Sequence, residues 1–490
     1  MADRSDERKK KKAPEAPDAP AAPDAPEGGE PSDAASSAPP GGRAAAWLRR
    51  QALPFAVFAV SATIFAVVTG PRTRGPSPDN HYVHLAESLL NGQLAQLGER
   101  PPGYNDWACF DTEANGVCPM SAFQRPREAY RWYVSFPPFP AVVIAPAVAI
   151  FGRDFSDPLF WAIFAGLAPA LLLALLRRLR EERLSLRRPW EELLLVALFA
   201  FGSVYFFSSV QGSVWFAAHV VASALLVGFL YFAIGARSPL GAGLMLGLCF
   251  VTRPTTAPFA LFFLFEAIRA SRHAGWTEGR GLVAWLAGTD WVPVLKKSAL
   301  FAVPILLVGL VAMWMNDARF GDPFEFGHTY LMIRWRPRIE KWGLFNYHYF
   351  AKNLSVYLAG LPWLSSTEPY VMISRHGLAL WFTSPALLPL LWPKKVSPLM
   401  AGLFASTALV AIWDLAYQNS GWVQFGYRFA LDYMPMLIVL LALSGRRFRG
   451  LFVTALVLSI AVNLFGAITF DRVPMFYDDD GTQDRLFQPD

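Results

Sequence analysis

Asp79 stands in the stretch Pro78-Asp79-Asn80-His81-Tyr82, which follows the first long apolar segment of the chain. A carboxylate just outside a membrane segment can accept a proton from a hydroxyl group at the membrane surface. We therefore interpret Asp79 as a candidate general base. The alternative is that Asp79 caps the helix expected to begin near His81, because Asp is a favoured N-cap residue. The two roles are compatible.

Three arginines are candidates for binding an anionic substrate group, namely Arg253, Arg319 and Arg428. A guanidinium offers a planar fork of donors and keeps its charge. Arg253 follows a short apolar segment, where a charge is costly unless it is used or paired. For each arginine the alternative is a salt bridge or snorkelling at the interface. Arg428 and Asp432 have the spacing of an ion pair on a helix.

His81 and Tyr82 are further candidates for contacting the substrate, although a lone interfacial histidine more often has a structural role. A divalent cation is a candidate cofactor, because hard cations prefer carboxylate oxygens and four acidic residues share one loop. These are Asp79, Asp106, Asp111 and Glu113. Their spacing fits no defined motif, so we expect no obligatory metal.

Two of the three cysteines, Cys109 and Cys118, lie within CFDTEANGVC after the first apolar segment. An oxidising compartment would favour a disulfide between them, closing a small loop that contains the turn-prone pair Asn115-Gly116. Two free thiols are the alternative. Cys249 falls inside an expected membrane span.

Composition places these residues on a membrane protein. Hydrophobic residues make up 54% of the 490, charged residues 17%, and the mean hydropathy is +0.30, which excludes a soluble globule. The net charge of +6 does not indicate nucleic-acid binding, because the basic residues cluster at the ends of apolar segments. We expect an all-α polytopic protein with about 11 transmembrane helices. The expected spans are Ala52–Thr69, Asp157–Leu176, Leu193–Ser208, Val214–Ile234, Leu240–Val251, Pro258–Ile268, Ala299–Met315, Gly377–Trp392, Leu399–Trp413, Met434–Ser444 and Leu451–Phe470.

Charge bias orients these spans. Arg49 and Arg50 put the N-terminus in the cytoplasm, together with the basic runs RRLREERLSLRR, PKK and GRRFRG. Residues 1–46 are Ala/Pro-rich and are expected to form a disordered cytoplasmic tail, followed by a membrane domain over 47–470. Large loops over 71–135 and 316–375, and the tail 471–490, then lie on the outer side.

Two short apolar regions complicate this map. Phe136–Gly152 contains four prolines, and we interpret it as a re-entrant or juxtamembrane element at the outer interface. Leu240–Val251 and Pro258–Ile268 resemble a helical hairpin, and its tip, Thr252-Arg253-Pro254-Thr255, is expected to face outward.

The stretch DNHYVHLAESLLNGQL resembles the first-loop signature of GT-C superfamily glycosyltransferases, which include polyprenyl-phosphate-mannose protein mannosyltransferases and aminoarabinose transferases. YVSFPPFPAVVIAPAVAIFG, CFVTRPT, NDARFGDPFEFGHTY and QFGYRFALDYMP resemble further elements of the group. Asn80 departs from the pattern, since many relatives have a second acidic residue there. Ser135-Phe136 also departs from it, because several relatives have a lysine before the proline pair.

The resemblance implies a GT-C-like fold and sugar transfer from a polyprenyl-phosphate lipid to a glycan, lipid or protein acceptor. It also implies a bacterial inner (cytoplasmic) membrane location with the site on the periplasmic side. The alternative functions are a transporter or flippase, or a non-catalytic membrane scaffold. Transporters usually carry ionisable residues deep within several spans, whereas here most lie at span ends. Neither the sugar nor the acceptor can be read from the sequence.

Overall fold

The computed structural model describes residues 40–98, 101, 106–272, 286–333 and 335–478. The chain divides into two compact units, Met1–Gln51 and Ala52–Asp490. Helix α1 (Pro40–Thr69) begins within the last residues of the region expected to be a disordered tail, and residues 1–39 of that region lie outside the described ranges. All features below belong to the second unit.

Six helical stretches within the described residues are long and apolar enough to cross a membrane. They are Gln51–Arg74, Asp157–Glu181, Val214–Ala236, Trp291–Phe320, Pro398–Leu415 and Gly450–Thr469. The expected count of about 11 is therefore not reached by helices of spanning length. The other five expected segments form shorter helices, which are α6 (Pro189–Phe201) with α7 (Tyr205–Ser209), α9 (Pro239–Phe250), α10 (Phe259–Arg269), α15 (Leu380–Thr383) with η6 (Pro385–Leu391), and α17 (Met434–Leu443).

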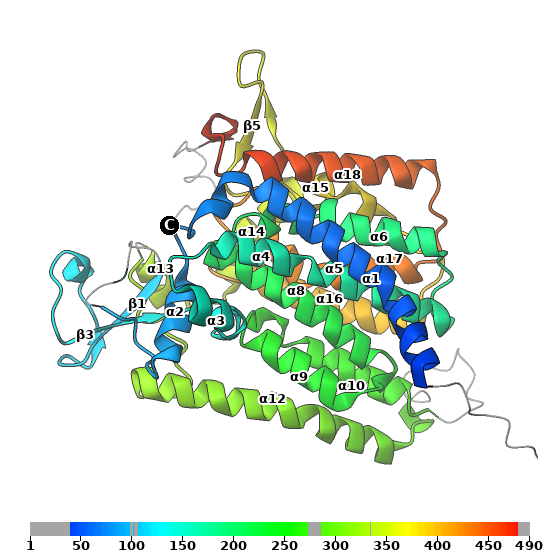
Figure 1. Ribbon diagram of the computed structural model, residues 1–490, viewed down its shortest axis with the longest axis horizontal. Helices are drawn as coiled ribbons and strands as arrows, with labels where there is room; N and C mark the ends of the chain where they lie inside the picture. The colour runs from blue at the N-terminus through cyan, green and yellow to red at the C-terminus, as the bar shows by residue number, and fades with distance from the viewer. Residues whose placement is uncertain (1–39, 99–100, 102–105, 273–285, 334, 479–490) are drawn as a thin grey trace, which may run out of the picture. The chain divides into compact units, whose positions relative to one another are not determined.

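Helix α8 (Val214–Ala233) forms the buried centre of the bundle, and α5 (Leu167–Glu181) and α9 pack against it (Figure 1). α12 (Trp291–Phe320) packs so closely on α9 that a Cβ atom at Gly243 would clash with the Phe301 carbonyl oxygen. The outward faces of the peripheral helices are apolar, with Phe55 of α1 69% exposed and Leu310 of α12 60% exposed. Helices with such faces suit a bilayer.

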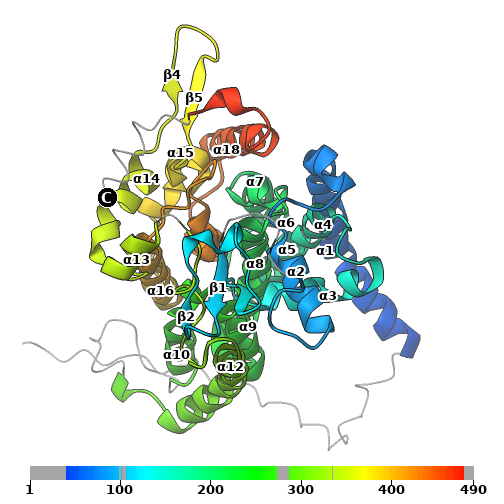
Figure 2. The ribbon, with the colours of Figure 1, turned by 90° about the vertical axis from the view of Figure 1, so that its left-hand side faces the viewer.

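The helices alternate in direction, which gathers the basic connections at one end of the bundle. The Arg187 guanidinium donates to the Leu441 carbonyl at 2.7 Å, and the Lys394 amide donates to the Ser444 carbonyl at 3.0 Å. The opposite end carries α2 (His81–Leu90), α3 (Phe139–Phe151), α13 (Arg336–Trp342) and α14 (Phe350–Ala359) (Figures 1 and 2). This grouping matches the charge pattern; the assignment of the ends to cytoplasm and exterior remains a prediction.

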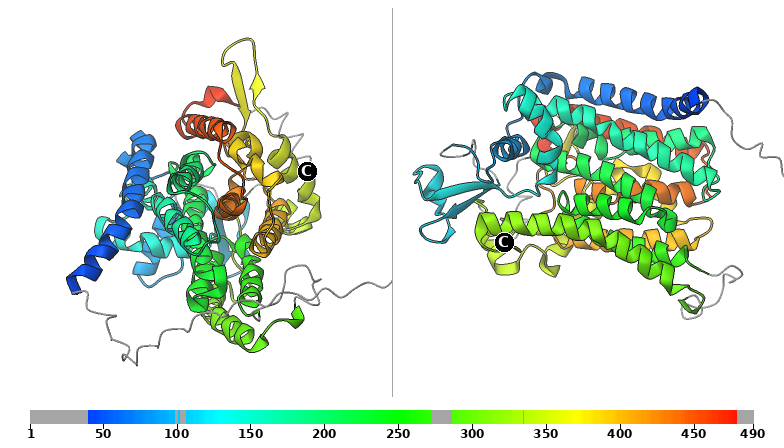
Figure 3. Two further views of the ribbon diagram at one scale, coloured as in Figure 1. Left: turned by 90° about the vertical axis from the view of Figure 1, so that its right-hand side faces the viewer. Right: turned by 60° about the horizontal axis from the view of Figure 1, so that its bottom comes forward.

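The fold also contains two small sheets, so the all-α prediction was wrong in detail. β1 (Trp107–Asp111), β2 (Gly116–Val117) and β3 (Tyr130–Val134) form an antiparallel sheet in the order β2-β1-β3, which projects from the bundle (Figure 3). β4 (Trp363–Leu364), β5 (Val371–Ser374) and β6 (Tyr477–Asp478) form the second sheet. Strands of two to five residues inside loops carry little periodicity, so the sequence did not reveal them.

The two large loops are joined to each other. The Cys109 amide donates to the Tyr330 carbonyl at 3.0 Å, and the Met332 amide donates to the Trp107 carbonyl at 2.9 Å. Cys109 and Cys118 form a disulfide, as expected, with their Cα atoms 5.5 Å apart. The first sheet and the second loop therefore form one wall at the end of the bundle that carries α2 and α3.

Phe136–Gly152, the proline-rich region, contains the 13-residue helix α3, which packs along α2. A helix of this length falls short of the roughly 20 residues needed to span a bilayer. The predicted hairpin of α9 and α10 turns through η4 (Pro254–Thr256), and this turn brings Arg253 to the end of the bundle that holds the large loops.

Candidate functional site

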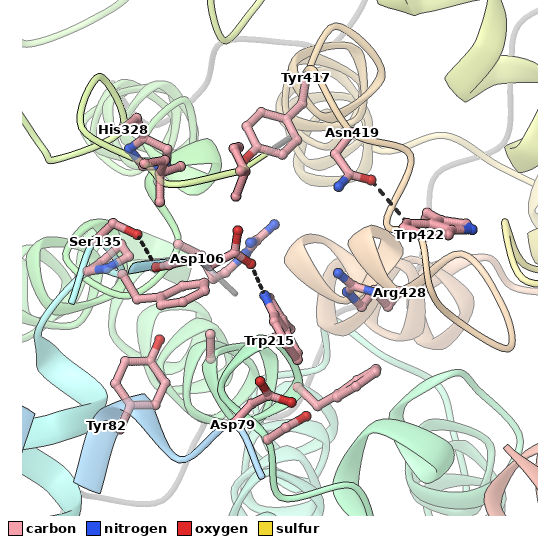
Figure 4. Close-up of a pocket in the computed structure, with 18 of the residues that line it drawn as sticks. Asp79, Tyr82, Asp106, Ser135, Trp215, His328, Tyr417, Asn419, Trp422 and Arg428 are labelled. Carbon is pink, nitrogen blue, oxygen red and sulfur yellow. Dashed lines mark hydrogen bonds between the residues drawn. The ribbon is translucent and has the colours of Figure 1, made fainter. Parts of the chain in front are cut away.

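A cavity of about 1240 Å³ lies at the end of the bundle that carries α2, α3 and the first sheet (Figure 4). Its loop walls come from five parts of the chain: the first loop, the α9–α10 turn, the second loop, the segment before α17, and Phe470 with Asp471 after the last long helix. The helices contribute terminal residues, such as Ser213 and Trp215 at the start of α8 and Trp413 near the end of α16 (Pro398–Leu415). The cavity therefore opens at one end of the helices.

Asp79 lines this cavity and is half-buried. The interpretation of Asp79 as a helix cap was wrong, because α2 begins at His81 with Asn80 in the N-cap position. Burial, followed by the nearby charges of Asp106 and Asp471, raises the pKa of Asp79 to about 6. A carboxylate with such a pKa is ionised at neutral pH and holds a proton better than an ordinary aspartate.

Asp106 is a second carboxyl group in the cavity. Its Oδ2 accepts a hydrogen bond from Trp215 Nε1 at 2.7 Å, and its carbonyl accepts one from Ser135 Oγ at 3.1 Å (Figure 4). Burial raises the pKa of Asp106. The sequence suggested this residue only as a metal ligand, since nothing in the pattern showed that α8 and the end of β3 would hold it beside Asp79.

The four acidic residues considered for a metal do not meet in one place. Asp111 Oδ1 accepts from the amides of Glu113 and Ala114, and Glu113 pairs with Arg127 at 2.8 Å. Neither Asp111 nor Glu113 lines the cavity. Within the described ranges, no three His, Cys, Asp or Glu side chains are grouped as metal ligands would be.

Arg253 forms a buried ion pair with Asp432. Its Nε lies 3.0 Å from both carboxylate oxygens and its Nη2 lies 2.7 Å from Oδ2, while Thr255 Oγ1 and His219 Nδ1 also reach Asp432, at 2.5 and 3.0 Å. Burial raises the pKa of Asp432, but the charge of Arg253, and then that of His219, hold this pKa well below its usual range. Asp432 thus pairs with Arg253, and the predicted pairing with Arg428 was wrong.

The pairing uses one edge of the Arg253 guanidinium. In the described part of the chain Nη1 has no hydrogen-bond partner, and the side chain lines the cavity. The ion pair and a contact with a ligand are therefore compatible. His219, the third residue that hydrogen-bonds to the Asp432 carboxylate, was not identified from the sequence. An ionisable residue inside an apolar span was a signal that could have identified it.

Arg428 lies in the same cavity without a carboxylate partner among the described residues. Its guanidinium donates to the carbonyls of Gly421 and Val423, and it lies over the rings of Phe216 and Phe429 at 5.2 and 5.4 Å. Burial, and then the charge of Arg253, lower the pKa of Arg428 to about 9. The side chain is thus a cation at neutral pH, and an anionic ligand would relieve the cost of burying its charge.

The remaining predicted residues are placed differently. Tyr82 lines the cavity, whereas His81 stacks on Trp107 with ring centroids 4.7 Å apart and does not line it. Arg319 also lies outside the cavity wall, donating to the Val134 carbonyl at 3.2 Å and to Asn316 Oδ1 at 2.5 Å. Of the predicted set, the structure brings together Asp79, Tyr82, Arg253 and Arg428.

Several buried polar atoms in the cavity wall have no hydrogen-bond partner among the residues that the structure describes. They are Tyr82 Oη, Gln211 Nε2, His328 Nδ1, Trp335 Nε1 and Arg428 Nε. Buried polar groups in folded proteins are nearly always paired, so their gathering here indicates a cavity built for a polar ligand. Figure 4 shows His328 and Tyr82 on one side of Asp106 and Trp215, and Arg428 on the other.

Comparison with known proteins gave similarity only to solved structures, since no protein-family model and no curated protein matched. The chain is similar to ArnT from Cupriavidus metallidurans bound to undecaprenyl phosphate, at 12% identity and a TM-score of 0.46, covering 83% of this chain and 63% of that one. It is also similar to the apo oligosaccharyltransferase of Archaeoglobus fulgidus, at 14% identity and a TM-score of 0.46, covering 89% and 59%. The chain thus spans about three fifths of each.

Proposed function

We propose that this protein is a membrane glycosyltransferase that moves a sugar from a polyprenyl-phosphate donor to an acceptor hydroxyl. One observation carries the proposal: the Asp79 carboxyl, with a pKa of about 6, shares a cavity with the cation Arg428, which has no carboxylate partner among the described residues. A base for the acceptor and a cation for the leaving group are the two functions that this transfer requires.

In the proposed reaction, the acceptor hydroxyl gives its proton to Asp79 while its oxygen bonds to C1 of the sugar. The bond between C1 and the phosphate oxygen breaks, and its electron pair leaves with the phosphate. Arg428 and the Nη1 edge of Arg253 stabilise the charge that develops there, because fixed donors act strongly in a buried site. Every step uses side chains of this chain, and none passes through a metal ion.

The cavity suits a lipid-linked donor. Aromatic residues such as Phe216, Phe429 and Phe470 line it beside the arginines, so an isoprenoid chain and a phosphate could lie together. Its volume of about 1240 Å³ exceeds the roughly 300–1,000 Å³ of ordinary ligand pockets, which leaves room for an acceptor. The cavity position at the helix ends favours an enzyme over a transporter, whose site usually lies at the midplane. We place this end at the periplasmic face of a bacterial inner membrane.

A transfer assay tests the proposal. The purified protein in lipid would be supplied with radiolabelled polyprenyl-phosphate sugars and membrane extracts as acceptors, and compared with the Asp79→Asn variant. We expect the wild-type protein to form product at least about a hundredfold faster than the variant. Absence of transfer from every donor, in protein that still binds the lipid phosphate, would contradict the proposed reaction.

A further inference from the structure

A second buried carboxyl group lies behind the Arg253–Asp432 pair. Asp414, in the last turn of α16, is 1% exposed, and neither of its carboxyl oxygens accepts a hydrogen bond in the described structure. Its carboxyl faces Asp432 and the Thr255 hydroxyl, and it shares the field of Arg253. The reaction proposed above assigns no role to Asp414.

The charges around Asp414 disfavour ionisation of both carboxyls. The ionisable groups around the pair are the guanidinium groups of Arg253 and Arg428, the imidazole of His219 on α8 and the phenols of Tyr427 and Tyr433. Of the two cations, only Arg253 is hydrogen-bonded to the pair in the described structure, because Arg428 donates to backbone carbonyls instead. Two ionised carboxylates in contact would therefore share one directly paired cation, and like charges in contact do not both ionise.

The hydrogen bonds decide which carboxyl is neutral. Asp432 accepts from Arg253, Thr255 and His219, so its charge is stabilised. The Thr255 hydroxyl lies near both carboxyls, but its single proton is donated to Asp432, so neither oxygen of Asp414 accepts a hydrogen bond in the described structure. The buried hydroxyl of Tyr427 makes no hydrogen bond to Asp414 either. An ionised carboxylate without donors in such a place is very costly, whereas a protonated carboxyl can donate to the anion that it faces.

We propose that Asp414 is protonated and donates a hydrogen bond to Asp432, so that the two carboxyls share one proton and one negative charge. Asp414 is then a positioning residue: it fixes Asp432, which fixes the guanidinium of Arg253 with its Nη1 edge on the cavity. The consequence for sugar transfer rests on the proposed function, but the protonation of Asp414 does not.

Infrared difference spectroscopy tests the protonation without any assay of activity. The spectrum of purified wild-type protein at pH 7 minus that of Asp414→Asn should contain the carbonyl band of a protonated carboxyl group, shifted in heavy water. Asp317→Asn is the matched control, because Asp317 is an exposed carboxyl group at the end of α12. Its removal should not change the spectrum where a protonated carboxyl group absorbs. Absence of the band from the Asp414 difference spectrum would overturn the proposal.

Transfer by three variants tests the positioning role. Asp414→Ala should lower the rate roughly ten- to a hundredfold, because Asp432 loses a donor, and Asp414→Asn should restore most of it, because a neutral amide can donate in the same place. Asp432→Asn should lose more than either. If Asp414→Asn is as inactive as Asp432→Asn, Asp414 acts as an anion and the proposal fails. If wild-type protein transfers no sugar while the infrared band is present, the proposed function fails and the shared proton stands.

Discussion

The backbone carbonyl of Asp79 accepts a hydrogen bond from the amide of Val214 at 3.0 Å. This bond fastens the first loop to the first residue of α8, so the main chain at Asp79 is held independently of its side chain. The carboxyl neither caps α2 nor forms a described ion pair, and it lines the cavity. Its chemistry can therefore be removed with little change in the fold.

Asp79→Asn should lower transfer by about 10² to 10⁴, the usual contribution of a general base, while the protein still folds. The melting temperature at pH 7 should rise slightly, because the folded-state pKa is raised and the buried charge opposes folding above that pKa. This gain should shrink as the pH falls below about 6 and should vanish below about 4, where the carboxyl is protonated in both the folded and the unfolded state. Transfer assays and thermal unfolding at both pH values measure these effects; near wild-type transfer would exclude Asp79 as the base.

The rate of transfer should rise with pH through about 6 and then level off, because Asp79 must lose its proton before it can accept another. Asp106→Asn should move this rise to lower pH, since the charge of Asp106 contributes to the raised pKa of Asp79. The asparagine can still accept from Trp215. Single-turnover rates between pH 4.5 and 8, roughly two units either side of the pKa, would show the shift. Identical profiles for the variant and the wild type would show that the charge of Asp106 does not act on Asp79.

Arg428→Gln should cost about 2.7–4 kcal/mol of transition-state stabilisation, as for loss of one well-placed donor to a developing anion. Arg428→Lys is the matched control, because it keeps the charge but not the planar fork, and it should retain part of the rate. Rates at saturating donor would distinguish them. Full activity of Arg428→Gln would show that other groups hold the phosphate.

Arg253→Gln should instead destabilise the protein by about 3–5 kcal/mol, because Asp432 would be left as a buried carboxylate without its cation. The double variant Arg253→Gln/Asp432→Asn should recover part of this loss, since no charge remains unpaired. Thermal unfolding of detergent-solubilised protein measures both. Equal stability of the single variant and wild type would mean that Asp432 takes up a proton when Arg253 is absent.

The disulfide should leave one free thiol. Labelling under denaturing conditions without reductant should modify Cys249 alone, and three cysteines after reduction. Replacing Cys109 and Cys118 with serine should destabilise the first loop by about 2–4 kcal/mol, since the crosslink limits the unfolded chain. Labelling of three thiols without reductant would contradict the pairing in membranes.

A reporter fused after Arg188 should be cytoplasmic, and one inserted near Glu340 external, because the basic connections share one end of the bundle. An external signal at Arg188 would reverse the membrane orientation and place the cavity at the cytoplasmic face. Fusions at Lys394, on the same end as Arg188, provide an independent control.

Much of the helical framework could be predicted from the sequence. Apolar runs such as Val214–Ile234 and Leu451–Phe470 became α8 and α18 (Gly450–Thr469) almost residue for residue, because length and hydropathy define them. The helix length was overestimated for segments that Pro, Gly or Ser interrupts. Gly202-Ser203 separates α6 from α7, and prolines leave only a 3₁₀ turn over Pro385–Leu391.

The site was predictable only where local sequence set the chemistry. Asp79 and Arg253 stood out through their positions beside apolar segments. Their partners did not, because the contacts of Arg253 with Asp432 and of Asp106 with Trp215 join residues 179 and 109 positions apart. The sequence did not show the position of Arg319 for the same reason, since its carbonyl partner Val134 lies 185 residues away. Spacing in one chain does not show such pairings.

The bond from the Cys109 amide to the Tyr330 carbonyl also has a consequence for biosynthesis. These residues are 330 − 109 = 221 positions apart, and translation at about 5–20 residues per second separates their emergence by roughly ten to forty seconds. During that interval the backbone groups on the part of the β1 edge that later contacts the second loop have no partner. Strands with such unpaired edges can pair with the wrong chain. A chaperone that covers this strand until the second loop has been made would therefore protect the nascent protein from mispairing at the end of the bundle where its cavity forms.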